Sequence, residues 1–353
     1  MNVKVLLISP SPVSIGGIAT WTGEFMKVLP NYNMNTVLVD ISVTGNRIKT
    51  NDNKINIFLE AQRCFKVWKN TFGCLFEEKP QIMHLNTSCS NRGVYRDFLC
   101  ALFAKLFGKP IILHCHCNVI DQLGKDKYAV ACFQKLCKLS SRILVLNKFS
   151  QEYVNELSKT EATIMPNFIS ADFILHRRII NNSIKRIVYV GQVRKSKGID
   201  SIIEVAKNNK SIVFDLVGPL TSEYDETTLG KIKNIVLHGA QKKEYIKNIL
   251  DKADVFLFPS KSEGFSLALL EAMARGLPVI TTDVGANKDM IEERGGVIVP
   301  LDDSIAIEAA INRISNKDLR EKMSIWNINK VANNYTIDIV MQRLTDLYKS
   351  IIR

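Results

Sequence analysis

Residues 258–280 read FPSKSEGFSLALLEAMARGLPVI and contain a complete strand, loop, helix, turn and second strand. The first strand ends at Pro259, and the apolar run after the polar loop predicts a helix that starts near Ser266. Gly276 and Pro278 are typical of the end of such a helix, and the next strand follows directly. A single helix that connects two strands makes them parallel, so this stretch predicts a βαβ unit of an α/β fold.

The same alternation of short apolar runs and helical patterns extends through the whole chain. In the first half, the strands expected are Val3–Ser9, Thr36–Asp40, Gln81–Leu85, Ile111–His116 and Arg142–Leu146. The helices expected between and after them are Ile18–Leu29, Glu60–Phe76, Tyr95–Phe107, Tyr128–Leu139 and Ser150–Ser158. In the second half, the strands expected are Arg186–Val190, Val213–Val217, Ile235–Leu237, Val255–Phe258, Val279–Thr282 and Gly296–Val299. The last helices expected are Ser304–Ser315, Lys317–Val331 and Ile337–Ile352.

This pattern predicts two domains in a chain of 353 residues. The second series of strands begins after Pro166, which disfavours helix in the residue before it. We therefore place one domain at residues 1–165 and the other at 166–336. Each is expected to be a Rossmann-like, doubly wound α/β domain, and the two are expected to face a central crevice. Ligands of such folds bind beyond the carboxyl ends of the strands, so the site is sought in residues just after strands.

Composition excludes several classes of protein. Hydrophobic residues make up 46% of the chain and charged residues 23%, as in globular rather than disordered proteins. No run reaches the roughly 18 apolar residues of a membrane span. Residues 1–9 carry a single lysine and read directly into a strand, unlike a signal peptide. We therefore expect a cytoplasmic protein.

The chain is basic, with a net charge of +12, and most of the excess lies in residues 1–165. A basic surface can favour nucleic acid, an anionic membrane or an acidic substrate. The basic residues are scattered and accompany no nucleic-acid-binding motif, so we expect no nucleic-acid partner. Peripheral association with the inner face of the cell membrane is the interpretation that we prefer.

The eight cysteines are too few and too irregularly spaced for a disulfide framework. The segment His114-Cys115-His116-Cys117 nevertheless has the residue types of a metal site. Because side chains alternate along a strand, its two histidines should face one side and its two cysteines the other. Four ligands from this segment cannot converge on one ion, so we expect reduced thiols and no metal.

Two glycine-containing loops precede helices, where a backbone can approach an anion closely. Gly16 and Gly17 follow the first strand, but the pattern is not GxGxxG, and a simple tight turn explains it equally well. Gly191 follows a later strand, and Arg194 and Lys197 come shortly after it. Cations placed just before a helix suit phosphate oxygens, although a solvated basic loop is the alternative.

The loop and helix start at residues 263–271 give the strongest signal. Backbone N–H groups at the start of this helix would lie at its positive end, where a diphosphate or a sugar can bind. Glu271 can accept hydrogen bonds from a vicinal diol such as a ribose, and Glu263 lies in the loop. As alternatives, Glu263 would cap the helix and Glu271 would lie on the surface, but Glu271 follows an apolar run. The backbone donors expected are those of Phe265, Ser266 and Leu267.

Together these motifs resemble the retaining GT-B glycosyltransferases called group 1 or family 4. The most specific element is the pair Glu263 and Glu271, with seven residues between them, followed by the pattern AMAxGxPVI. The resemblance extends over nearly the whole chain. Supporting elements are the Gly16-Gly17 loop, His116 at a strand end, residues 191–198, His238-Gly239-Ala240 and Val284-Gly285-Ala286.

The resemblance implies two Rossmann-like domains with separate roles. The second would hold a nucleotide diphosphate sugar, and the first would hold the acceptor, with no metal or other cofactor. It also implies that the helix at 337–353 packs back on the first domain, in agreement with the apolar stripe of Ile337–Ile352.

Residue by residue, the resemblance implies a role for each motif. Glu271 would hold the donor ribose, and Glu263 would face the transferred sugar. His116 would lie against that sugar at the reaction centre, unless it is a buried structural histidine. Lys197 and Arg194 would neutralise the departing diphosphate. The donor-binding residues implied are Gly16, Gly17, Gly191, Gly264, Phe265, Ser266, Leu267 and Glu271.

One position departs from the family pattern. Gln192 stands directly after Gly191, where the family usually has arginine. A glutamine can form hydrogen bonds but cannot neutralise charge. Either Arg194 reaches the diphosphate instead, or Lys197 and the helix dipole stabilise the leaving group without it.

We therefore expect a retaining hexosyltransferase that acts on a glycan or a lipid-linked acceptor. Its setting would be biosynthesis of a surface polysaccharide of the capsule, exopolysaccharide or O-antigen type. Two alternatives stay open: another GT-B enzyme, such as a nucleotide-sugar epimerase or a phosphorylase, and a non-catalytic nucleotide-sugar-binding protein. The sequence does not specify the donor base, the sugar, the acceptor or the linkage.

One helix of the first domain bears on membrane association. Between Arg63 and Phe76, large apolar residues recur every three or four positions, with basic residues between them. Such a helix can lie in an anionic lipid surface. For this helix we prefer the alternative, in which it covers the sheet with its aromatic residues in the core. The apolar residues are Phe65, Trp68, Phe72, Leu75 and Phe76, and the basic ones are Arg63, Lys66 and Lys69.

Overall fold

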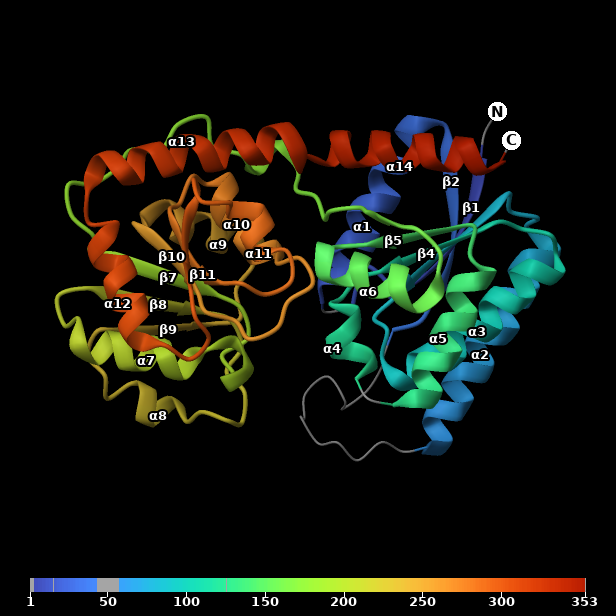
Figure 1. Ribbon diagram of the computed structural model, residues 1–353, viewed down its shortest axis with the longest axis horizontal. Coiled ribbons are helices and arrows are strands. Elements are labelled where there is room, and N and C mark those ends of the chain that lie inside the picture. The colour runs from blue at the N-terminus through green and yellow to red at the C-terminus, as the bar shows by residue number, and fades with distance from the viewer. Residues whose placement is uncertain (1–2, 15, 43–56, 125, 353) are drawn as a thin grey trace. The chain divides into compact units, whose positions relative to one another are not determined.

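A computed structural model describes residues 3–14, 16–42, 57–124 and 126–352 of the chain (Figure 1). The chain divides into two compact units. Unit 1 comprises Met1–Asn167 together with Val340–Arg353, and unit 2 comprises Phe168–Ile339. Each unit contains a parallel sheet of six strands, which confirms the predicted α/β class.

The sheet of unit 1 has the strand order β2-β1-β3-β4-β5-β6, so the order changes direction between β1 and β3. The strands are β1 (Val3–Ser9), β2 (Met34–Asp40), β3 (Ile82–Thr87), β4 (Ile111–Cys115), β5 (Arg142–Val145) and β6 (Ala162–Ile164). The helices are α1 (Gly17–Val28), α2 (Ile57–Glu77), α3 (Asn91–Leu106), α4 (Val119–Leu123), α5 (Lys127–Leu139) and α6 (Lys148–Ser158), with α14 (Ile337–Ile352) near the C-terminus. The expected elements are present with ends shifted by a few residues, whereas β6 and α4 were not predicted.

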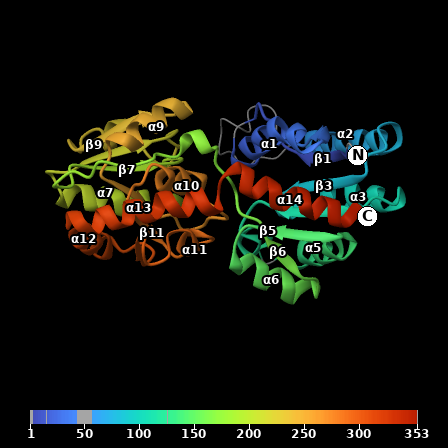
Figure 2. The ribbon, with the colours of Figure 1, turned by 90° about the horizontal axis from the view of Figure 1, so that it is seen from above.

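The two faces of this sheet differ in chemistry, because successive side chains of a strand point to opposite faces. One face is apolar: Leu6 and Leu85, for example, are buried in a core with residues of α2, α3 and α5. The other face carries the buried polar residues Ser9, His84 and Asn86. It is covered by α1 and α14, and Figure 2 shows α14 running across the sheet beside β3.

The sheet of unit 2 has the order β12-β11-β10-β7-β8-β9, so its direction changes between β7 and β10. A ligand of such a sheet binds in the loops on either side of this change. The strands are β7 (Arg186–Val190), β8 (Val213–Val217), β9 (Ile235–Gly239), β10 (Val255–Phe258), β11 (Val279–Thr282) and β12 (Gly296–Val299). The helices are α7 (Ile199–Asn208), α8 (Glu226–Leu229), α9 (Lys243–Lys252), α10 (Leu267–Ala274), α11 (Asn287–Ile291), α12 (Ser304–Arg313) and α13 (Lys317–Asn334).

Two glycines bring the loops at the carboxyl edge of this sheet into direct backbone contact. Gly198, after β7, has φ 73°, and a Cβ atom there would lie 2.0 Å from the carbonyl oxygen of Pro259 after β10. Gly285, after β11, has φ 56°, and its Cβ would lie 2.1 Å from the carbonyl oxygen of Glu263. Only glycine allows both the left-handed backbone and the close approach.

Substitution of Gly198 tests this contact. Gly198→Ala and Gly239→Ala both place alanine at a positive φ, which costs about 1–2 kcal/mol. At Gly239, with φ 64°, a Cβ meets no atom within 4 Å, so that variant measures the backbone strain alone. We expect Gly198→Ala to lower the free energy of unfolding by a further ~1–3 kcal/mol, because the loop must move. Urea unfolding measures both variants. If the free energy of unfolding falls equally in Gly198→Ala and Gly239→Ala, the loops after β7 and β10 tolerate a side chain at Gly198.

Candidate active site

The N-terminus of α10 lies at the carboxyl edge of the sheet of unit 2. Ser266 is its N-cap: the serine Oγ accepts a hydrogen bond from Leu269 N at 3.2 Å, so the helix proper begins at Leu267. Its first backbone N–H groups, including that of Leu267, are not used by the helix itself. Phe265 anchors the turn, because its buried ring makes an edge contact with Tyr335 at 5.4 Å between centroids. This helix end can therefore receive an anion.

Glu271 lies on the less buried face of α10, one turn after Leu267 and Ala268. The other residues of that turn, such as Leu270 and Ala272, are buried in the core. Burial raises the pKa of the Glu271 carboxyl to about 7, and the nearby cation of Lys243 on α9 only partly opposes this shift. A carboxyl that titrates near neutrality beside a helix N-terminus is typical of a functional site.

Lys197 and Glu263 form an ion pair at this edge. Lys197 lies in the loop after β7, and its Nζ is 2.6 Å from Oε1 of Glu263 in the loop after β10. Both side chains are mostly shielded from solvent, with exposed fractions of 24% and 12%. The two loops are also tied together by the hydrogen bond from Lys261 N to Ser196 O, at 3.0 Å. The ion pair thus lies at the change of strand direction between β7 and β10.

The turn at Gly191 is closely packed. A Cβ atom at Gly191 would lie 2.6 Å from the Tyr189 hydroxyl, which donates a hydrogen bond to the carbonyl oxygen of Gln192 at 2.8 Å. Burial raises the pKa of this phenol, the nearby Glu263 carboxylate adds to the rise, and the Arg194 guanidinium at the same edge opposes it. Among the described residues, Arg194 Nε is buried without a hydrogen-bond partner. Lys197, in contrast, pairs directly with Glu263.

Unit 1 holds the other predicted site residues. Gly16, with φ 136° and ψ 162°, precedes α1 at its N-cap, and Gly17 begins the helix. Trp21, from the first turns of α1, makes an edge contact with the His116 ring at 5.0 Å between centroids. His116 follows β4, and its Nε2 lies 3.0 Å from Oδ1 of Asn86 at the end of β3. The structure thus places the glycine loop and His116 at the same edge of this sheet.

The histidines and cysteines at the end of β4 face opposite sides, as predicted from the alternation of side chains. The rings of His114 and His116 lie side by side, with 3.9 Å between centroids. Cys115 and Cys117 instead lie near the thiol of Cys89, and this neighbour together with burial raises the pKa values of both. The eight cysteines, all within the described ranges, form no disulfide. In those ranges, no group of three or more His, Cys, Asp or Glu side chains is arranged to hold a metal ion.

The sequence analysis missed Asn86 and His84 beside His116. Both are fully buried on β3, and the register pairs Asn86 with His114 of β4. The signal was present, because His84 and Asn86 alternate with apolar residues, which places polar groups on one face of a buried strand. These residues therefore belong to the surroundings of the candidate site in unit 1.

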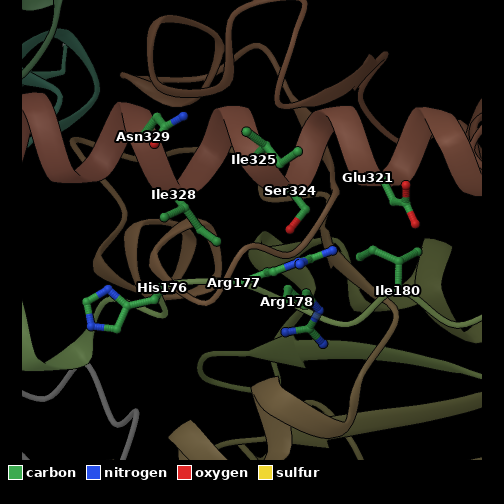
Figure 3. A pocket seen from close by; sticks show the side chains of 9 residues that line it. All are labelled: His176, Arg177, Arg178, Ile180, Glu321, Ser324, Ile325, Ile328 and Asn329. Carbon is green, nitrogen blue, oxygen red and sulfur yellow. The ribbon is translucent and has the colours of Figure 1, made fainter.

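A separate cavity of about 110 Å³ lies in unit 2 between α13 and the segment before β7 (Figure 3). His176, Arg177, Ile325 and Ile328 are among the residues that line it. Arg178 also lines it, but its guanidinium donates hydrogen bonds to backbone carbonyls, including that of Arg275 at 2.9 Å. None of the predicted site residues borders this cavity.

Comparison with known proteins points to one family. A family model described as "Glycosyl transferases group 1" matches residues 173–330, which is most of unit 2. This part of the chain is therefore similar to the group 1 glycosyl transferases. Members of that family, also called family 4, are retaining sugar-transfer enzymes.

Relatives and a solved structure agree with this similarity. The chain is 24% identical, over 98% of its own length and 97% of the relative, to a UDP-Gal:alpha-D-GlcNAc-diphosphoundecaprenol alpha-1,3-galactosyltransferase of Escherichia coli. It is 29% identical to the capsular polysaccharide biosynthesis glycosyltransferase CapM of Staphylococcus aureus, over 50% of this chain and 49% of CapM. The structure of Anabaena HepE in complex with UDP matches with a TM-score of 0.75 at 13% identity, over 99% of this chain and 100% of HepE. This likeness confirms the predicted GT-B fold.

The raised pKa of Glu271 predicts that nucleotide-sugar binding depends on pH. The carboxyl is largely protonated at pH 6 and largely ionised at pH 8, and the ionised form accepts both hydroxyls of a ribose. We expect affinity for the tightest binder among UDP- and GDP-sugars to rise severalfold between these pH values. In Glu271→Gln this dependence should disappear, with affinity at pH 8 lower by about 10- to 100-fold, the value of a hydrogen bond to a charged group.

Isothermal titration calorimetry at both pH values measures these affinities. The diphosphate of a nucleotide sugar has no group that titrates in this range, so Glu271 is the source of the expected slope. Because its pKa rises on folding, the unliganded protein loses stability as pH rises from about 4.5 to 7. Glu271→Gln should therefore melt at a higher temperature at pH 8, which shows that the variant is folded. The same pH slope in both proteins would remove Glu271 from the nucleotide site.

Proposed function

We propose that this enzyme transfers a hexose from a nucleotide diphosphate sugar to a glycan or lipid-linked acceptor in surface polysaccharide biosynthesis. The part of this proposal that concerns the donor rests on one observation: the Lys197–Glu263 pair and the N-terminus of α10 lie at the same sheet edge. Glu271 follows one turn into the same helix. The names of the relatives support the acceptor half: one acts on a diphosphoundecaprenol-linked sugar, and another serves capsule biosynthesis.

The Lys197–Glu263 pair suggests how binding and catalysis are coupled. Without a donor, the Lys197 charge is satisfied by Glu263 at 2.6 Å. A donor diphosphate that approaches Lys197 competes for this cation, and the Glu263 carboxylate is then available to accept hydrogen bonds from sugar hydroxyls. As the bond between sugar and phosphate breaks, negative charge grows on the diphosphate. Lys197 and the α10 N–H groups stabilise that charge, because they are already in place.

The proposed reaction is tested with a panel of UDP- and GDP-sugars, with and without a membrane extract that supplies lipid-linked acceptors. We expect release of nucleotide diphosphate that depends on the acceptor, and a product with the same anomeric configuration as the donor by NMR. Isomerised sugar without an acceptor would identify an epimerase, and turnover that requires phosphate would identify a phosphorylase. Tight binding without turnover would identify a non-catalytic binding protein.

Replacement of Lys197 tests its role in stabilising the leaving group. Because the diphosphate gains charge in the transition state, Lys197→Ala should lower kcat by about 100-fold or more and raise KM much less. Lys195→Ala is the matched control, since the exposed Lys195 contacts Glu223 through its backbone N–H at 2.7 Å. We expect kcat of Lys195→Ala to remain within about twofold of the wild-type value. A kcat of Lys197→Ala close to that of the wild type would place the phosphate site elsewhere.

We also propose that unit 1 associates peripherally with an anionic membrane through α2. The preferred expectation, that the aromatics of this helix lie in the core, is wrong for most of them. Val67 and Leu75 bury the inner face, and Trp68 packs against the core. Phe65 and Phe76, in contrast, are 67% and 65% exposed.

The exposed aromatics of α2 lie along one line of the helix. Phe58, Phe65 and Phe72 are spaced seven residues apart, and Phe76 follows one turn later, so all four fall on one stripe. Lys66 and Lys69 are exposed on the same helix, between these aromatic residues in the sequence. Within the described ranges, no helix is long and apolar enough to cross a membrane. A stripe of aromatics beside lysines instead suits a helix that lies in the headgroup region.

Reversal of the charges on α2 tests the membrane proposal. Each lysine near an anionic surface contributes about 1 kcal/mol, so Lys66→Glu with Lys69→Glu should weaken vesicle binding by roughly 30-fold or more. Lys207→Glu with Lys210→Glu makes the same charge change on exposed residues of unit 2 and should leave binding nearly unchanged. Flotation with phosphatidylglycerol vesicles at low salt measures both. Equal binding to neutral vesicles, or equal losses in the two variants, would contradict a specific basic surface on α2.

A further inference from the structure

A chain of hydrogen bonds leads from His116 into unit 1 and ends on a backbone carbonyl. His116 Nε2 lies 3.0 Å from Asn86 Oδ1, and Asn86 Nδ2 lies 2.9 Å from Ser9 Oγ. Ser9 Oγ lies 2.6 Å from Thr22 Oγ1, which in turn lies 2.8 Å from the carbonyl oxygen of Ile18. Ser9, Thr22 and Asn86 are all fully buried, so water does not compete for these contacts.

The direction of every bond in this chain follows from its end point. The carbonyl of Ile18 can only accept, so the single hydroxyl hydrogen of Thr22 is used there. Ser9 must then donate its own hydrogen to Thr22, and it can only accept from Asn86. The NH2 group of Asn86 therefore faces Ser9, and its carbonyl oxygen faces His116. Because that oxygen is only an acceptor, His116 carries a hydrogen on Nε2.

Burial keeps His116 neutral, so this hydrogen is its only one. Desolvation lowers the pKa of His116 and of His84 to about 3, and burial lowers that of His114 well below its usual value. A neutral imidazole with hydrogen on Nε2 has a lone pair on Nδ1. No hydrogen bond of the described residues engages that atom, and His116 is partly exposed. His116 therefore presents a hydrogen-bond acceptor, not a donor, at the sheet edge.

A second series of hydrogen bonds, called here the Tyr348 ladder, lies beside the His116 ring but forms no hydrogen bond with it. Tyr348 of α14 forms a hydrogen bond with His84 Nδ1, and His84 Nε2 lies 3.2 Å from His114 Nδ1. The ring of His114 packs beside that of His116, and Trp21 covers the histidines. This ladder fixes the position of the imidazole, whereas the Asn86 chain fixes its hydrogen. The two effects can therefore be separated by substitution.

We propose that Asn86 is a positioning residue for sugar transfer, which holds His116 in the tautomer whose Nδ1 accepts a hydrogen bond from a hydroxyl group of the bound sugar. The inference rests on the proposed function in one respect, namely that a sugar contacts His116. It predicts a substrate with a hydroxyl hydrogen at that point, and discrimination against a deoxy or O-methyl analogue, because the lone pair would then lose its partner.

The tautomer is measured without reference to activity. Protein labelled with 15N in the histidine rings gives separate NMR signals for protonated and unprotonated nitrogens, assigned to His116 by comparison with His116→Gln. We expect Nε2 of His116 to be protonated and Nδ1 to be unprotonated. This preference should be lost in Asn86→Leu and kept in Tyr348→Phe, which removes a bond of the other ladder only. Hydrogen on Nδ1 in the wild type, or an unchanged tautomer in Asn86→Leu, would overturn the inference.

A second variant tests the effect on the reaction. Asn86→Asp still accepts from Nε2, but its negative charge raises the pKa of His116, and the imidazolium then carries a hydrogen on Nδ1 as well. Relative to the wild type at each pH, kcat of Asn86→Asp should be lower by roughly 10- to 100-fold at low pH and should recover as pH rises. Ring NMR of the same variant measures the titration of His116. The pH dependence of the kcat ratio should coincide with this titration curve.

Ring NMR separates His116 from its neighbours. The titratable groups on its side of the sheet are His84 on β3 and His114 on β4, with Tyr348 behind His84, whereas Cys115 and Cys117 lie on the opposite face. Asn86 also interacts with His84, so the NMR titration of Asn86→Asp is followed at His84, His114 and His116, and the kcat ratio should follow that of His116. A loss in Asn86→Asp that does not vary with pH would mean that Asn86 has only a structural role, and would overturn the inference. A wild type that shows the expected tautomer but no sugar transfer would instead contradict the proposed function.

Discussion

Backbone contact between loops sets the geometry of the proposed donor site. Without side chains at Gly198 and Gly285, the loops after β7 and β11 press against the loop after β10, at Pro259 O and Glu263 O. This contact brings Lys197 within 2.6 Å of Glu263 and orients the turn that begins α10. The charges of the site are therefore in place before any ligand binds, as electrostatic stabilisation of a leaving group requires.

The two units contribute different chemistry. Unit 2 supplies charge: a lysine, two carboxylates and the positive end of a helix, with the pKa of Glu271 raised into the physiological range. Unit 1 supplies neutral groups, because burial keeps His84 and His116 uncharged, and the hydrogen bond to Asn86 determines which ring nitrogen of His116 carries the hydrogen. In the proposed function, a neutral His116 accepts a hydrogen bond from a sugar hydroxyl, and it carries no positive charge that would attract the diphosphate.

The sequence predicted the parts of the structure that depend on local patterns. The strands of both sheets and the start of α10 at Ser266 follow from apolar runs and capping chemistry. β6 has only three residues, too few to show a period, and was missed. α2 carries two apolar stripes, one through Val67 and Leu75 and one through Phe65 and Phe76, and periodicity alone does not tell which faces the core. The alternation along β3 indicated that Asn86 lies on a polar face, but its proposed role depends on Ser9 and Thr22, which only the fold brings to it.

A crystal structure with the tightest-binding nucleotide sugar tests the central claim most directly, because it locates the donor atom by atom. We predict ribose hydroxyls within hydrogen-bond distance of Glu271, and diphosphate oxygens at the first N–H groups of α10 and at Lys197 Nζ. We also predict that Lys197 gives up at least part of its contact with Glu263. A nucleotide bound in the cavity beneath α13, beside His176 and Arg177, or a diphosphate that contacts neither Lys197 nor α10, would contradict this assignment.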